Sequence, residues 1–315
     1  MYVQMSKDGD GVVGQPSKIV LSGASGMLGT ALRRRLEALR VPIVQLVRGA
    51  PRGDGQVSWD PAAMPAIADT SALEGSWAAI HLSGASVAAH RWTAAYKREL
   101  TASRVESTRA IAMILAGLRK PPQTLVVASA VGIYGDRGDA VLDEASAPGV
   151  GFLAEVCQKW EEAANPAADA GIRVVHARFG VVLGRGPGAL EKMLPVFRLG
   201  LGGRLGSGRQ WMSWVSLDDA VGAILFALEN ESLAGAVNVV APNPVTNAEF
   251  TRALARLLHR PAVLPAPTFA LRLALGQMAD EALLASARVA PAKLMSAGFE
   301  FAHPTVDRAL AAALG

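Results

Sequence analysis

The chain has 315 residues, 51% of them hydrophobic and 18% charged, which is typical of a globular protein and not of a disordered one. The net charge of +4 is modest and no basic stripe alternates with aromatic residues, so nucleic acid is not an expected partner. The single cysteine, Cys157, excludes an internal disulfide, and the five histidines are too widely spaced to suggest a metal site. No apolar run is long enough to cross a bilayer, so we expect a cytoplasmic protein without membrane contact.

The first apolar run predicts a strand, which a glycine turn and then a helix follow directly. Glycines stand at positions 23, 26 and 29, and the helical pattern extends from Met27 to Leu39. Gly23 allows a tight turn, Gly26 lets the backbone approach a pyrophosphate, and Gly29 lets helix and strand pack closely. The spacing G-x-x-G-x-x-G differs from the standard G-x-G-x-x-G, and ordinary surface-turn glycines are the alternative. The strand before and the helix after favour a nucleotide site.

Strands and helices then alternate as far as Gly180. Apolar strands are expected at residues 41–47, 78–82, 124–128 and 172–177, with helices at about 92–118 and 152–170. Strands buried on both faces and separated by helices predict an α/β fold with a Rossmann-like, doubly wound parallel sheet. Ligands of such sheets bind at the carboxyl ends of the strands.

Beyond Gly180 the alternation weakens, and glycine and proline accumulate. Helices are expected at about 217–229, 247–258 and 269–287. We therefore predict a flexible extension over residues 1–17 and a dinucleotide-binding domain over 18–183. Residues 184–315 are expected to form a smaller, substrate-side α/β lobe with a C-terminal helical segment. Trp211 and Trp214 are expected either to line the cleft or to fill the core between the lobes.

The end of the second strand indicates which dinucleotide is bound. NAD-binding units carry a carboxylate there for the ribose hydroxyls, whereas this chain has Val47-Arg48-Gly49. A guanidinium can bind the oxygens of a 2′-phosphate bidentately, although an arginine in a loop can also be simply solvated. The residues favour NADP over NAD.

Several dispersed motifs together resemble the extended short-chain dehydrogenase/reductase superfamily. Within it, the chain resembles the atypical "epimerase family protein" group, which carries a C-terminal domain of unknown function, over roughly residues 18–312. The motifs are the glycine turn, His81-Leu82-Ser83-Gly84-Ala85, Arg91-Trp92, Ser103-Arg104-Val105-Glu106-Ser107-Thr108, Ser129-Ala130-Val131-Gly132-Ile133-Tyr134-Gly135, Trp160-Glu161, Arg178-Phe179-Gly180-Val181-Val182-Leu183-Gly184, Gly202-Gly203-Arg204-Leu205-Gly206-Ser207-Gly208-Arg209-Gln210 and Arg288-Val289.

The resemblance implies a set of NADP contacts. Arg104 stands where extended members usually carry Asn, and an exposed helical ion pair is the alternative for Glu99 and Arg104. The contacts fall on Gly23, Ser25, Gly26, Met27, Leu28, Gly29, Val47, Arg48, Leu82, Ser83, Gly84, Glu99, Arg104 and Val182.

The catalytic groups of typical members are missing from this chain. Such members use a Ser and a Tyr-x-x-x-Lys pair, in which Lys lowers the pKa of a phenol that is otherwise near 10. Their Tyr, Lys and Ser positions fall here on Leu153, Cys157 and Ala130. Ser129 and Tyr134, at the end of the fifth strand, are the candidate catalytic substitutes. Cys157 is either a packed residue or a weak thiol acid.

Two functions remain open on this sequence. The first is an NADP-dependent oxidoreductase or nucleotide-sugar-type epimerase with non-standard catalytic residues, acting on an unknown small-molecule substrate. The second is a non-catalytic NADP(H)-binding sensor or scaffold. Extended members often form a homodimer through helices that correspond to 92–118 and 152–170 here, and such a homodimer is compatible with both functions.

Overall fold

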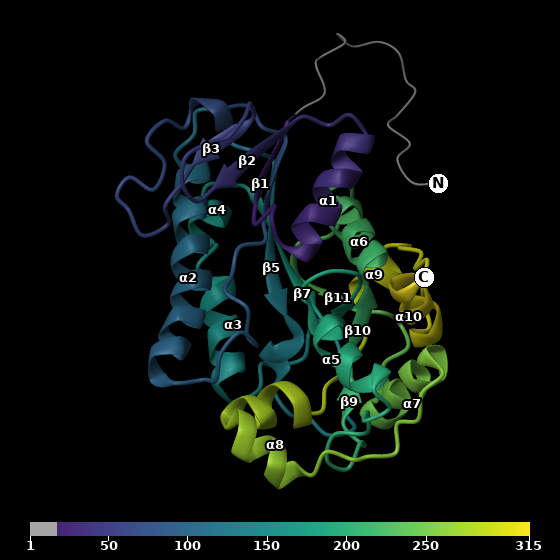
Figure 1. Cartoon of the computed structure of the whole chain (residues 1–315). Helices are drawn as coiled ribbons and strands as arrows, with labels where there is room; N and C mark the ends of the chain where they lie inside the picture. The colour runs from purple at the N-terminus through teal and green to yellow at the C-terminus, as the bar shows by residue number, and fades with distance from the viewer. Residues whose placement is uncertain (1–17) are drawn as a thin grey trace.

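A seven-stranded parallel sheet organises the computed structural model, which describes residues 18–315 (Figure 1). Its strand order is β11-β7-β5-β4-β1-β2-β3, and every neighbouring pair is parallel. This confirms the expected Rossmann-like, doubly wound α/β fold. The extension predicted for residues 1–17 lies outside the described residues. The strands are β1 (Ile19–Ser22), β2 (Ile43–Val47), β3 (Gln56–Ser58), β4 (Ala78–His81), β5 (Thr124–Ala130), β7 (Arg173–Phe179) and β11 (Gly235–Val239).

Helices cover both faces of the sheet, which is why β1 and β4 are buried along their whole length. On one face α1 (Met27–Ala38) packs against α6 (Leu217–Glu229). On the other face α2 (Ala94–Ala116) packs against α3 (Phe152–Glu162) and α4 (Asn165–Asp169), as Figure 1 shows.

Two predicted helices are interrupted. The helix expected over 152–170 divides between α3 and α4, where Pro166 lies in the first turn of α4 and has no N–H to donate. The prediction of a single helix over 269–287 is wrong in its extent. α8 (Thr268–Leu275) ends at Gly276, whose φ of +63° leaves the helical region, and a π-helical turn follows over Ala279–Leu284.

The C-terminal part adds short strands and helices around a second core, in which Phe197, Trp214, Phe250 and Leu310 are buried. Trp214 is therefore a core residue. The remaining strands and α-helices are β6 (Val141–Leu142), β8 (Val181–Leu183), β9 (Trp211–Met212), β10 (Trp214–Ser216), β12 (Val245–Thr246), β13 (Arg288–Val289), α5 (Ala189–Arg198), α7 (Asn247–Leu258), α9 (Ala292–Ser296) and α10 (Val306–Leu314).

Two segments that follow residue 183 return to the large sheet. β11 pairs with β7 at its edge, and α6 packs on the same face as α1. The large sheet is therefore not built only from residues before 183, because its edge strand β11 comes from the C-terminal half of the chain.

Candidate functional site

The glycine turn joins β1 to α1 at the carboxyl edge of the sheet. Gly23 has a φ of +73°, and a Cβ atom there would lie 2.6 Å from the carbonyl carbon of Leu82. A Cβ at Gly29 would lie 2.1 Å from the Gly23 oxygen, so a side chain at residue 29 would separate the helix from the turn. At Gly26 a Cβ would make only an ordinary contact of 3.5 Å with the same oxygen. Gly23 and Gly29 therefore maintain the turn itself, whereas Gly26 is exposed and can face a ligand.

The start of α1 is uncapped. Gly26 occupies the N-cap position, no side chain accepts a hydrogen bond there, and the first turn has no acidic residue. Ser25 is exposed, while Met27 and Leu28 are half-buried. Backbone N–H groups at such a helix start, with the positive end of the helix dipole, suit a phosphate.

Two further segments border this helix start. Leu82, Ser83 and Gly84 follow β4 and contact the turn through Leu82. A Cβ at Gly188 would lie 3.3 Å from the Met27 Cε, so the glycine-rich segment after β8 also passes beside α1. The run of glycines is visible in the sequence, but its contact with Met27 is not, because the two segments are far apart in the chain. The expected contact Val182 lies in β8, half-buried against the main core.

Arg48 follows the last residue of β2 at the same edge of the sheet. β2 pairs directly with β1, with Ser22 opposite Leu46, so Val47 and Arg48 lie level with the glycine turn. The Arg48 side chain is exposed, and no carboxylate among residues 18–315 forms an ion pair with it. This cation is therefore available to an anionic ligand.

Arg104 on α2 lies beneath the segment that follows β4. Its Nη2 donates to the Ala85 carbonyl at 2.8 Å, and its Nη1 donates to the Leu100 carbonyl at 3.1 Å. Its Cζ lies 5.1 Å from the centre of the Trp160 ring, and burial lowers the pKa of Arg104. Glu99 is exposed, and the described residues contain no ion pair between Glu99 and Arg104. The alternative of an exposed helical ion pair is therefore wrong for this pair.

His81 at the end of β4 has a structural environment. It is completely buried, its Nδ1 lies 2.6 Å from the Ser22 Oγ, and its Nε2 lies 3.1 Å from the Ser107 Oγ. Burial lowers the pKa of His81 to about 3, so the imidazole is neutral at physiological pH. It joins β1, β4 and α2 beneath the site.

The three positions that correspond to the missing Ser, Tyr and Lys lie together. A Cβ at Gly132 would lie 3.4 Å from the Leu153 Cβ and 4.0 Å from the Cys157 Sγ, and Ala130 packs in the same apolar cluster as Cys157. Burial raises the pKa of the Cys157 thiol to about 12, so it is not a base at neutral pH. Of the three side chains, only the buried Cys157 thiol carries a titratable proton, and it keeps that proton at neutral pH.

Ser129 and Tyr134 belong to a buried polar network. The Ser129 Oγ donates to the Glu161 carboxylate at 2.7 Å, and Glu161 accepts two hydrogen bonds of 2.8 Å from Arg178. The Tyr134 hydroxyl accepts from Arg178 at 2.9 Å and donates to the Asn238 Oδ1 at 2.8 Å. Tyr134 has no exposed surface, and burial raises its pKa. The catalytic roles expected for Ser129 and Tyr134 stay predictions, and both hydroxyls already have protein partners.

Comparisons with known proteins agree with this geometry. Residues 19–240 match the model of the "NAD dependent epimerase/dehydratase family", and residues 266–313 match a "Domain of unknown function (DUF1731)". The chain belongs to the NAD-dependent epimerase/dehydratase family. This confirms the resemblance drawn from the motifs.

Members of this family from distant organisms match nearly the whole chain. "Epimerase family protein MT2273" of Mycobacterium tuberculosis is 44% identical over 93% of this chain and 96% of its own length. The human epimerase family protein SDR39U1 is 36% identical over 93% of this chain and 98% of its own. A crystal structure of human SDR39U1 isoform 2 "with NADPH" superimposes with a TM-score of 0.85, at 33% identity, and covers 93% of this chain and 97% of that one.

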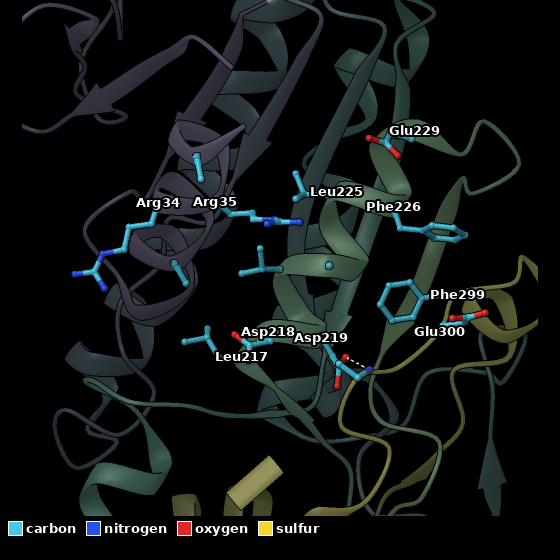
Figure 2. A pocket seen from close by; sticks show the side chains of 15 residues that line it. Arg34, Arg35, Leu217, Asp218, Asp219, Leu225, Phe226, Glu229, Phe299 and Glu300 are labelled. Atoms are coloured by element: carbon cyan, nitrogen blue, oxygen red, sulfur yellow. Dashed lines mark hydrogen bonds between the residues drawn. The ribbon is translucent and has the colours of Figure 1, made fainter. Parts of the chain in front are cut away.

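A groove of about 690 Å³ lies elsewhere, between α1 and α6 (Figure 2). Leu225, Phe226 and Phe299 provide apolar lining, and Arg34 and Arg35 lie on the α1 side. None of the residues expected to bind the cofactor lines it. Within residues 18–315, no three His, Cys, Asp or Glu side chains gather as a metal site.

Proposed function

We propose that this member of the family binds NADP(H) at the carboxyl edge of its sheet. The observation that carries the proposal is the glycine cradle, in which Gly23 and Gly29 have no room for a Cβ while Gly26 is exposed at an uncapped helix start. The pyrophosphate binds at this helix start, and the free guanidinium of Arg48 binds the 2′-phosphate. The family relative crystallised with NADPH supports the same cofactor.

We place the nicotinamide end of the cofactor beside Gly84, which follows β4, and Arg104 of α2. Arg104 keeps unused N–H groups on a guanidinium that lies 3.5 Å from where a Cβ of Gly84 would be. A bulky side chain at Gly84 would therefore push against Arg104. We assign both residues to the wall that positions the nicotinamide ribose.

Substitution of Arg48 tests the cofactor preference. In Arg48→Ala, NADPH binding should weaken at least about tenfold, since a charge-assisted hydrogen bond contributes about 1.5–3 kcal/mol, while NADH binding should change little. Arg109→Ala, which removes another exposed cation from α2, is the matched control. Equal weakening for both nucleotides in Arg48→Ala would reject the 2′-phosphate contact.

We further propose that the protein with bound NADP(H) is an oxidoreductase or epimerase that uses non-standard residues for proton transfer. NADP(H) supplies the hydride donor or acceptor when bound. Ala130 and Leu153 carry no titratable proton, and burial raises the pKa of Cys157 to about 12, so the proton has to pass through another group, for which Ser129, Tyr134 and water are the candidates. Net consumption of NADPH with small carbonyl compounds tests the oxidoreductase, and we expect one reduced product per NADPH oxidised. Conversion of a nucleotide sugar into its epimer, with no net change of the bound cofactor, tests the epimerase.

A non-catalytic NADP(H)-binding protein is the second candidate. The apolar packing around Leu153, which includes Trp92, Phe152 and Met278, favours it, because the Leu153 side chain itself cannot act as an acid or a base in place of the tyrosine. Tight NADPH binding without turnover of any carbonyl or nucleotide-sugar compound would select this function.

A further inference from the structure

Two stretches of the C-terminal lobe, residues 192–217 and 250–279, contain no acidic residue. The basic residues within them are Lys192, Arg198, Arg204, Arg209, Arg252, Arg256, Arg260 and Arg272. In a chain with 31 basic and 27 acidic residues, these two stretches carry an excess of positive charge, although Arg256 is paired with Asp307 of another segment.

The two stretches lie side by side. The Ala266 N–H donates to the Arg204 carbonyl at 2.9 Å, and the Gly206 N–H donates to the Ala266 carbonyl at 2.8 Å. At Gly203 the approach is so close that a Cβ would lie 1.8 Å from the Leu264 oxygen. α8 begins immediately afterwards, with the Thr268 Oγ1 2.8 Å from where a Cβ of Gly206 would be.

Large apolar side chains are exposed along these stretches and on α8. No residue of α8 is buried, and Phe269 and Leu273, one helical turn apart, are 74% and 76% exposed. α8 lies at the edge of the molecule in Figure 1. The apolar patch comprises Leu199, Leu201, Val263, Leu264, Phe269 and Leu273.

Exposed cations accompany the apolar patch. Arg198, Arg204 and Arg260 form no ion pair with a carboxylate in the described part of the chain, and the Arg260 Nε donates to the Arg198 carbonyl at 3.0 Å. Arg272 on α8 pairs with Asp280 at 2.8 Å. Exposed apolar side chains and unpaired guanidinium groups thus alternate along the same two neighbouring stretches.

We propose that the apolar patch docks on the surface of an anionic phospholipid bilayer. Phe269, Leu273 and their apolar neighbours enter the acyl boundary, while the arginines contact lipid phosphates. A second copy of the chain fits less well, because a two-fold contact would place the same cations against one another. The docking is peripheral, since no described helix is long and apolar enough to span a bilayer. It departs from the expectation, drawn from the sequence, of no membrane contact.

Flotation of the full-length protein with lipid vesicles tests the docking. Binding to vesicles of phosphatidylcholine with phosphatidylglycerol is expected, with little binding to phosphatidylcholine alone and weaker binding as salt is raised. In the double variant Phe269→Ser/Leu273→Ser, binding should weaken at least about tenfold. Arg198→Gln/Arg260→Gln should weaken binding only to the anionic vesicles.

A control variant and a second readout separate docking from misfolding and self-association. Met113→Ser removes an exposed apolar side chain from α2 and should leave vesicle binding unchanged. Thermal unfolding should stay within a few degrees of the wild type for all the variants, because every substituted side chain is exposed and only the Arg260 hydrogen bond to the Arg198 carbonyl is lost. The proposal is overturned if the wild-type protein ignores anionic vesicles. It is also overturned if light scattering shows an oligomer that Phe269→Ser/Leu273→Ser dissociates without any vesicle binding by the wild type.

Discussion

The Glu281 carboxylate accepts a hydrogen bond of 2.8 Å from the backbone N–H of Leu153, in the first turn of α3. Glu281 lies in the π-helical turn of the C-terminal domain, and Leu153 occupies the position of the missing catalytic tyrosine. The glutamate thus supplies the cap that Gly151, at the N-cap position of α3, cannot supply from its own side chain. This contact anchors the C-terminal domain of unknown function beside the expected substrate position.

Substitution of Glu281 should therefore destabilise the junction of the two parts. In Glu281→Ala the free energy of unfolding should fall by about 0.5–2 kcal/mol, because an N-terminal cap and a favourable helix-dipole interaction are both lost. Urea denaturation measures the change. Glu162→Ala, at the exposed end of the same helix, should have little effect, and equal loss in both variants would show that the cap contributes nothing specific.

The two glycines at positions 26 and 29 should respond differently to alanine. Gly29→Ala should prevent stable folding of the turn, since its Cβ would lie 2.1 Å from a backbone oxygen. Gly26→Ala should fold normally, because its φ is −71° and its Cβ meets only a contact of 3.5 Å, yet it should lose NADPH affinity by at least about tenfold. Thermal unfolding and NADPH titration separate the two effects. Unchanged affinity in Gly26→Ala would place the pyrophosphate elsewhere.

Removal of the Tyr134 hydroxyl should affect stability more than chemistry. Tyr134→Phe leaves an Arg178 N–H and the Asn238 Oδ1 without their partner, which should cost about 1–3 kcal/mol of unfolding free energy. Urea denaturation checks this value. NADPH turnover per folded molecule, where turnover is found, should stay within a few-fold of wild type, whereas abolished turnover at unchanged stability would make Tyr134 the catalytic acid.

His81 should make the fold sensitive to mild acid. Its folded-state pKa of about 3 lies below the ordinary value of 6.5, so the unfolded chain binds a proton first as the pH falls. Stability from this group is fully present above pH 6.5 and declines towards pH 3, by at most about 1.4 kcal/mol per pH unit. The unfolding free energy of His81→Gln should fall less steeply between pH 7 and pH 5. An unchanged slope in His81→Gln would contradict this assignment.

Local patterns predict the elements whose periodicity is strong. Helices α6 and α7 begin and end at the expected residues 217–229 and 247–258, because apolar spacing and their Ser216 and Thr246 caps agree.

Local sequence patterns do not predict strand β11. It is a five-residue strand that begins at a glycine and contains Asn238, a polar residue that is completely buried. Its place in the sheet depends on pairing with β7, which local sequence does not reveal.

The site was predictable only where a motif determines it. The glycine turn, Arg48 and the segment after β4 lie at one edge of the sheet, because parallel strands end together there. The partners of Ser129 and Tyr134 were not predictable, since Glu161, Arg178 and Asn238 come from α3, β7 and β11. Such long-range polar contacts depend on the tertiary packing of the whole sheet.

Titration of the purified wild-type protein with NADPH and with NADH, followed by energy transfer from tryptophan to the nicotinamide, tests the central claim most directly. The glycine cradle and the free Arg48 guanidinium predict saturable NADPH binding, with NADH bound at least about tenfold more weakly. Absence of binding by either nucleotide would contradict the claim that this edge of the sheet is a dinucleotide site.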